Sequence, residues 1–188
     1  TAYRRQRQMC IRDRYKPSGG GGIKPFIIST LYTVGLSLLI ATPIGVLSAV
    51  YLQEYAKQGK LVRVIRYSTE ALAGIPSIVY GLFGAAFFVS ALKFGYSLLA
   101  GSLTLSIIIL PVIIRTTEEA LKVVPPSYRE ASLGLGATRF QTLYKVILPS
   151  AIPGILSGVI LSMGRVIGES AALFLTAGTV YKIPTSIM

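Results

Sequence analysis

Three long stretches of the chain contain no charged residue, and this feature limits the possible folds more than any other. The stretches are 26–52, 71–92 and 94–114, which are 27, 22 and 21 residues long. A helix needs about 20 apolar residues to cross a hydrocarbon layer of about 30 Å. A fourth apolar stretch, 151–178, contains only two charges. We therefore expect four membrane-spanning helices at these positions.

The alternative is a soluble protein whose apolar helices are buried. Charged residues make up 14% of the 188 residues, whereas soluble domains contain about 25%. The mean hydropathy of +0.64 is also high. A chain of this length cannot enclose several helices that are apolar all round. Prolines within the stretches are tolerated in membrane helices. The expected fold class is therefore all-α, a polytopic membrane helix bundle.

The net charge of +12, from 19 basic and 7 acidic residues, predicts the orientation of this bundle. Nine basic residues lie in 53–66 and 115–150, against three between the other ends of the spans (Lys24, Lys93 and Lys182). By the positive-inside rule, the two basic loops lie in the cytoplasm. The positive charge thus indicates a multi-pass protein of the cytoplasmic membrane in contact with lipid, and no nucleic-acid partner.

The first 16 residues do not fit this orientation, because they contain six basic residues on the outer side. One interpretation is a basic arm (1–16) that contacts anionic lipid. The other is that this stretch is not native to the protein. We assign no function to Cys10 within this arm. Residues 17–25 form a Gly-rich join between the arm and the apolar region.

The residues that enzymes and metal sites most often use are nearly absent. The chain has no His and one Cys, so it has neither the commonest general base nor a CxxC metal motif. The sequence GGIKP at residues 21–25 lacks the Gly before Lys that a phosphate-binding loop requires. We expect no catalytic residue, no metal, no bound cofactor and no ATP site in this chain, which is therefore not an enzyme.

The basic loop 115–150 has a helical pattern of its own. Gly134 and Gly136 predict a bend between two short helices. The second helix has apolar residues at the spacing of a half-buried face, namely Phe140, Leu143, Tyr144, Ile147 and Leu148. This hairpin either joins two spans at the membrane surface or inserts into a groove of a partner.

The spacing of residues in this loop resembles a known family. Glu130-Ala131-Ser132 is followed after three residues by Gly136, after nine more by Val146, and after one more by Leu148-Pro149. This is similar to the EAA loop of ABC-importer permeases, E-A-A-x3-G-x9-I-x-L-P, with Ser132 and Val146 as the two departures. The resemblance implies a type I ABC-importer transmembrane domain over residues 26–188. In that family the loop docks on a cytoplasmic ATPase, here through Glu130, Ala131, Ser132, Gly136, Leu148 and Pro149.

Three further segments, 52–66, 73–84 and 158–178, resemble the PstA-type permeases of phosphate-specific importers. The resemblance implies an importer of inorganic phosphate and a fragment with about four of six spans. It also implies three kinds of partner. These are a homologous permease of the PstC type, a dimer of PstB-type ATP-binding subunits that holds ATP and Mg, and a periplasmic or lipid-anchored phosphate-binding protein of the PstS type.

Arg165 and Glu169 are the only opposite charges inside an apolar stretch, at a spacing of one helical turn. Either they form a structural ion pair, or Arg165 lines the substrate path, because guanidinium donors match the geometry of phosphate. Gly154, Gly158 and Ser162 share a helical face and predict close helix packing.

Other functions stay open at this point. The same permease could import another oxyanion, such as molybdate or sulfate. From a different class, the chain could be a membrane scaffold or a channel whose hairpin binds a regulator. A membrane enzyme has little support, because no nucleophile–base pair is evident at membrane depth.

Overall fold

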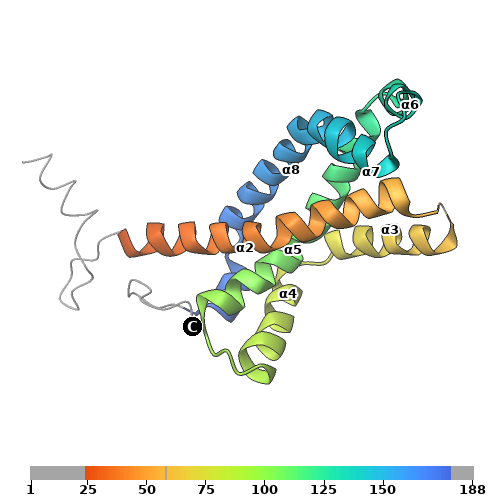
Figure 1. Cartoon of the computed structure of the whole chain (residues 1–188). Helices are drawn as coiled ribbons and strands as arrows, with labels where there is room; N and C mark the ends of the chain where they lie inside the picture. Colours follow the sequence, from red (N-terminus) through yellow and green to blue (C-terminus); the bar gives the residue numbers. More distant parts are fainter. Residues whose placement is uncertain (1–23, 58, 179–188) are drawn as a thin grey trace, which may run out of the picture. The chain divides into compact units, whose positions relative to one another are not determined.

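Helices form all the regular structure of residues 24–57 and 59–178, which this computed structural model describes (Figure 1). The expected all-α fold is therefore confirmed. The basic arm 1–16, the join up to residue 23 and the end 179–188 lie outside the described residues. The helices, labelled as in Figure 1, are α2 (Lys24–Val50), α3 (Lys60–Ala73), α4 (Ser77–Gly84), α5 (Leu98–Val123), α6 (Pro126–Gly134), α7 (Arg139–Thr142), α8 (Leu148–Gly168) and α9 (Ala171–Thr176). Three π-helical segments continue α2, α4 and α7, namely η1 (Tyr51–Tyr55), η2 (Ala85–Ala91) and η3 (Leu143–Ile147).

Three continuous helical stretches are long and apolar enough to cross a membrane. They are Phe26–Tyr55, Leu98–Val123 and Arg139–Gly168, of 30, 26 and 30 residues. Lys60–Ala73 and Ser77–Ala91 make a fourth candidate only when they are taken together as one broken span. The chain is thus a multi-pass membrane protein, in agreement with the length of its uncharged stretches.

The expected span 71–92 is not one helix in the structure. α3 ends at Ala73, and α4 begins at Ser77. Pro76 explains the break, because it has no N–H to donate and disfavours the helical conformation of the residue before it. The prediction of one continuous helix over residues 71–92 is therefore wrong, and its place in the membrane stays a prediction.

Two other expected boundaries also differ from the structure. The span expected at 94–114 is the helix Leu98–Val123, which enters the expected loop. Ion pairs one turn apart, Arg115–Glu119 and Glu118–Lys122, stabilise this extension. The span expected at 151–178 is interrupted, because α8 ends at Gly168 and α9 begins at Ala171.

The fold divides into two compact units. The first contains the described residues up to 37, 76–105 and those from 167 on, and the second contains 38–75 and 106–166. In the first unit α4 packs against α9. Gly84 makes this packing close, because a Cβ at this position would lie 2.8 Å from a methyl group of Thr176.

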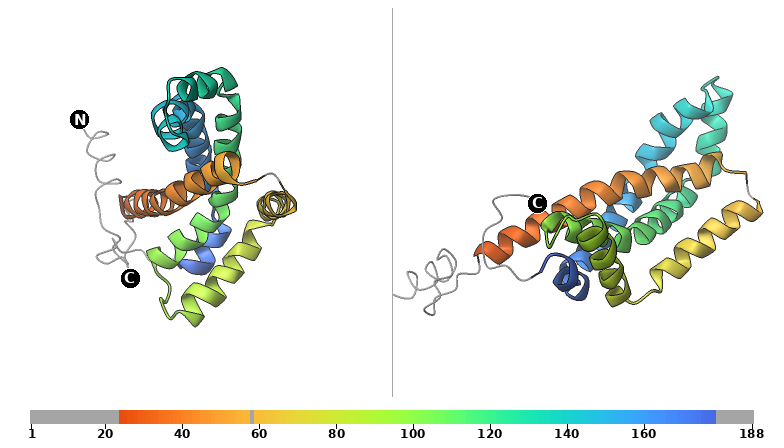
Figure 2. Two further views of the ribbon diagram at one scale, coloured as in Figure 1. Left: turned by 45° about the vertical axis from the view of Figure 1, so that its right-hand side comes forward. Right: turned by 90° about the horizontal axis from the view of Figure 1, so that it is seen from below.

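The second unit has two hydrophobic clusters arranged around the C-terminal half of α5. One joins the end of α5 to the hairpin and to α8, through Leu121, Val124, Leu143, Ile147 and Ala151. The other joins α5 to the end of α2 and to α3, through Ala49, Leu52, Val62 and Ile114. Both views of Figure 2 show α6 and α7 beside the start of α8. The hairpin is thus attached to a packed helical core.

Candidate functional site

The expected helical hairpin is present between α5 and α8. Pro126 occupies the start of α6, a position where its missing N–H costs little. Gly136 turns the chain with a φ of +85°, a conformation that a residue with a Cβ adopts only with strain. Thr138 then starts α7, since its hydroxyl accepts a hydrogen bond from the backbone N–H of Gln141. The second helix continues without a break into α8.

The predicted docking residues lie on different sides of this hairpin. Glu130, Ala131 and Gly136 are exposed. Ser132 is half-buried, and its hydroxyl lies 2.9 Å from that of Thr142, which is buried. This hydrogen bond links the two helices of the hairpin. At the far end of the motif, Leu148 is half-buried and Pro149 is exposed at the start of α8.

The apolar face predicted for residues 140–148 is divided in the structure. Leu143 and Ile147 are buried in the cluster beneath the hairpin. Phe140 and Tyr144 are exposed, with parallel rings 6.5 Å apart. Leu135 in the turn is 89% exposed. Bulky apolar side chains that project together from a turn and a helix are typical of a surface that a partner covers.

Arg129 attaches α6 to the end of the first span. Its Nη2 donates a hydrogen bond to Oε1 of Glu54 in η1, and it lies 3.4 Å from the carbonyl oxygen of Leu121 at the end of α5. This contact is not predictable from the sequence, because it joins residues 75 positions apart and no local pattern indicates it.

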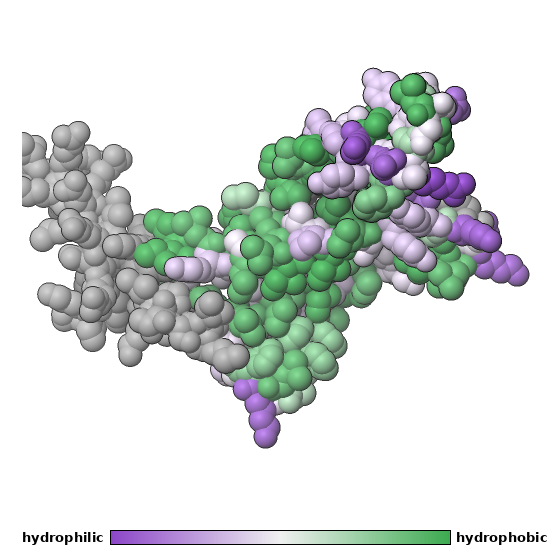
Figure 3. All heavy atoms as spheres, viewed as in Figure 1, coloured by the Kyte–Doolittle hydropathy of each residue, from purple (hydrophilic) through white to green (hydrophobic). Residues whose placement is uncertain are grey.

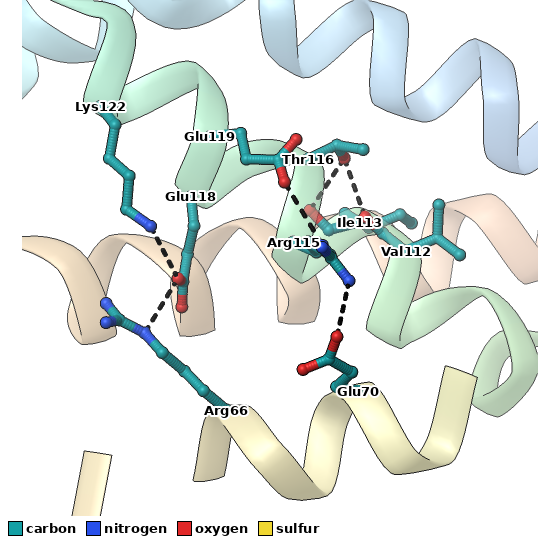
Figure 4. A network of polar contacts seen from close by, with 9 residues as sticks. All are labelled: Arg66, Glu70, Val112, Ile113, Arg115, Thr116, Glu118, Glu119 and Lys122. Carbon is teal, nitrogen blue, oxygen red and sulfur yellow. Dashed lines mark hydrogen bonds and ion pairs between the residues drawn. The ribbon is translucent and has the colours of Figure 1, made fainter. Parts of the chain in front are cut away.

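Charged side chains of α3 and α5 form a network beside the hydrophobic core (Figure 4). Glu118 is the buried centre of one part, with its Oε2 3.1 Å from Nε of Arg66 and 3.9 Å from Nζ of Lys122. Arg115 is exposed and contacts both Glu70 and Glu119 at 3.3 Å. In the sequence, these basic residues indicate only the orientation of the bundle. Their acidic partners, Glu118 and Glu119 in the loop 115–150 and Glu70 just after the loop 53–66, are the sequence signal for the network.

The network borders a cavity of about 430 Å³ in the second unit. Its charged side is formed by the residues above, and Ala73, Pro111, Val112 and Leu161 contribute an apolar side. Basic and acidic residues alternate around it and pair with each other. The pairs therefore stabilise the packing of α3 on α5 rather than concentrating one sign of charge.

The remaining predicted residues lie on or after α8. Arg165 is half-buried on α8, one turn after Leu161 of the cavity wall. Glu169 follows the end of α8, so the expectation that both charges share one continuous helix is wrong. The Glu169 carboxylate instead accepts a hydrogen bond from the backbone N–H of Ala172 at 3.4 Å. A pairing of Arg165 with Glu169 stays a prediction.

Two of the small residues predicted for helix packing, Gly154 and Gly158, face α5. A Cβ on Gly154 would lie 2.6 Å from the Cβ of Ala120, and one on Gly158 would lie 2.1 Å from Oγ1 of Thr116. Ser162 is fully buried and donates its hydroxyl to the carbonyl of Gly158 at 2.9 Å. Close approach of α5 and α8 therefore depends on this side of α8.

Within the second unit, polar side chains gather at the end that carries the hairpin, and apolar side chains cover a long helix. Figure 3 shows hydrophilic side chains over the end of α2, the start of α3 and the hairpin. The visible face of α8 is apolar, and Leu156, Ile160 and Leu161 on this helix are exposed. Exposed apolar residues on a long helix indicate a lipid or helix contact.

A comparison with protein families matches residues 41–187 to the binding-protein-dependent transport system inner membrane component family. Similar proteins include the probable ABC transporter permease protein YqgI of Bacillus subtilis (strain 168), 44% identical over 86% of this chain and 55% of that protein. The phosphate transport system permease protein PstA of Pasteurella multocida (strain Pm70) is 43% identical over 86% of this chain and 57% of its own length. PstA 1 of Mycobacterium tuberculosis (strain ATCC 25618 / H37Rv) is 39% identical over 87% of this chain and 53% of its own length. The chain thus spans about half the length of these relatives.

Solved structures show the same fold. Two crystal forms of the MetNI methionine ABC transporter in inward-facing conformations match with TM-scores of 0.63 and 0.68. The first is 27% identical and covers 78% of this chain and 68% of that chain. The second is 24% identical and covers 93% of this chain and 77% of that chain. The type I ABC-permease fold that the loop motif implies is therefore confirmed.

Proposed function

This chain belongs to the binding-protein-dependent transport system inner membrane component family, and from that premise we propose that it is part of a permease that imports inorganic phosphate. It lies in the cytoplasmic membrane of a prokaryote. It forms the translocation path with a homologous permease subunit of the PstC type. Its similarity to several PstA permeases supports phosphate as the cargo.

The observation on which this proposal chiefly rests is the hairpin between α5 and α8. It exposes Glu130, Ala131 and Gly136 of the family motif, together with the bulky side chains Leu135 and Phe140. A projecting apolar hairpin fits a groove on a partner. That partner is a dimer of PstB-type ATP-binding subunits, which bind ATP and Mg and perform the hydrolysis, so that this chain is not itself an enzyme.

A phosphate-binding protein of the PstS type delivers the cargo from outside. ATP binding and hydrolysis then move the hairpins, and the two permease subunits expose the path first to the outside and then to the cytoplasm. Such alternating access requires helices that slide or rock as packed bodies. The close packing of α8 on α5 supports the movement of these helices as one body.

Arg165 is the residue of the path that binds the anion in this proposal. It is half-buried on a helix whose neighbouring residues are apolar, where an arginine is costly and is typically retained for function. Its planar group of donors fits two oxygens of phosphate. Glu169 lies in the break after α8, where it can accept a hydrogen bond from a partly protonated phosphate.

Uptake by proteoliposomes tests this proposal. The complete permease is reconstituted with its homologous partner, the ATPase and the binding protein, and ATP-driven accumulation of radiolabelled phosphate is measured. The Arg165→Ala variant is expected to lose uptake while the complex still assembles. Arg165→Lys, which keeps the charge but loses the fork of donors, is expected to retain part of it. Normal uptake by Arg165→Ala would refute the role of Arg165, and absence of uptake by the unchanged complex would refute the cargo.

A further inference from the structure

The contact between Arg129 and Glu54 is the most direct polar connection between the hairpin and the spans in the described residues. Arg129 lies on α6, and Glu54 lies in η1, which ends the first span. The Arg129 side chain is 29% exposed and that of Glu54 is 17% exposed. Both charges are thus partly shielded from water, where a charge-assisted hydrogen bond is stronger than at an open surface.

Both residues are fixed to packed elements. Two residues before Glu54, Leu52 is buried in the cluster with Val62 and Ile114. The π-helical form of η1 also sets the direction in which Glu54 projects, and π-helical turns often occur at functional positions. On the hairpin side, Arg129 also lies near the carbonyl of Leu121, itself in the cluster beneath the hairpin. Neither end of the contact can move freely.

Arg129 directly precedes Glu130, the first residue of the docking motif. Successive residues of an α-helix point about 100° apart. Glu130 is exposed, while Arg129 is directed to η1 and α5. One turn of α6 therefore presents one charge outward, where a partner can bind, and anchors the other inward.

We propose that the Arg129–Glu54 pair transmits movement of the hairpin to the first span. The inference rests on the proposed function, because it assumes that an ATPase moves the hairpin. When α6 is displaced, the hydrogen bond from Arg129 to Glu54 displaces η1 as well. The helix α2 therefore moves together with the hairpin and α5. Without the pair, the hairpin remains attached to α5 and α8 through the apolar cluster, against which Val50 of α2 also packs, but it loses its polar link to η1 and can shift further relative to α2. Arg129 and Glu54 are thus positioning residues and do not touch the cargo.

The experiment measures coupling in the complete reconstituted complex. Phosphate transported per ATP hydrolysed is compared for the wild type, Glu54→Gln, Arg129→Gln and the charge-exchanged Glu54→Arg/Arg129→Glu double variant. We expect the single variants to lower this ratio about tenfold, since charged hydrogen bonds are among the stronger polar contacts. We expect the exchanged pair to restore much of the loss. Glu119→Gln is the matched control, because its ion pair with Arg115 is exposed and lies within α5.

A second measurement does not depend on transport. Amide hydrogen exchange in Pro126–Gly134 of the purified permease is expected to be faster in Glu54→Gln than in the wild type or in Glu119→Gln. An unchanged transport ratio in both single variants would overturn the inference, as would unchanged exchange. Absence of transport by the wild type would refute the proposed function, whereas the exchange measurement would still decide whether the pair holds α6.

Discussion

Gly158 of α8 and Thr116 of α5 lie so close that no side chain fits between them. A Cβ on Gly158 would lie 2.1 Å from Oγ1 and 2.8 Å from the Cβ of Thr116. Thr116 cannot easily turn away, because its hydroxyl donates to the carbonyl of Val112 at 2.9 Å. The backbones of the two helices approach through this gap, as small residues allow in membrane proteins.

Gly158→Ala is therefore expected to separate α5 from α8 locally. Overpacking of this kind lowers the free energy of unfolding by about 1–3 kcal/mol. Thermal denaturation of the permease in detergent measures the change. Gly164→Ala is the control on the same helix, since a Cβ there meets nothing within 4 Å, and its stability should not fall. Equal stability of the two variants would contradict the packing argument.

Gly136→Val is expected to strain the turn of the hairpin. The φ of +85° places Gly136 in the left-handed region, which costs a residue with a Cβ about 1–2 kcal/mol. The altered turn should weaken co-purification of the ATPase and its stimulation by the permease. Gly134→Ala is the comparison, because Gly134 has no positive φ and no close neighbour at its Cβ position. Full stimulation by Gly136→Val would show that the turn does not set the docking geometry.

Glu118→Gln is expected to destabilise the second unit more than Glu119→Gln. The side chain of Glu118 is 8% exposed and pairs with Arg66 and Lys122, so its removal leaves cations without their counter-charge. A loss of about 1.5–3 kcal/mol is expected for such charged contacts. Glu119 is 61% exposed, and its pair with Arg115 contributes less than about 1 kcal/mol. Thermal stability in detergent ranks the two, and a larger loss in Glu119→Gln would be inconsistent with the network.

Ser132→Ala is expected to loosen the hairpin slightly. The variant removes the hydrogen bond to Thr142, whose hydroxyl is buried, at a cost of about 1 kcal/mol. Faster amide exchange in Arg139–Thr142 would report the change. Ser127→Ala on the exposed start of α6 serves as the comparison. Identical exchange in the two variants would show that Ser132 does not hold the helices together.

Local sequence patterns were enough to predict the fold class and the hairpin. Uncharged length indicated the spans, and Gly134 with Gly136 indicated the bend. Where each helix begins and ends was harder to predict, because a few residues can interrupt or extend a helix whatever the apolar content of the stretch. Pro76 interrupts an otherwise apolar stretch, and the charges from Arg115 to Lys122 extend a helix beyond the apolar part through pairs one turn apart.

Contacts between distant residues were not predictable from one sequence. The pairs Arg129–Glu54 and Arg66–Glu118 join residues that become neighbours only when α2, α3, α5 and α6 pack. The charges were visible, but nothing local distinguishes a paired glutamate from a solvated one. The face of α8 with Gly158 was predictable as a packing face, whereas its partner Thr116 was not.

The most direct test of this account is the competition of anions in proteoliposomes that contain the complete permease, its homologous partner, the ATPase and the binding protein. ATP-dependent uptake of radiolabelled phosphate is measured with an excess of unlabelled phosphate, sulfate or molybdate. We expect uptake that requires ATP and is suppressed only by phosphate. Uptake suppressed by sulfate or molybdate, or no uptake of phosphate at all, would contradict it.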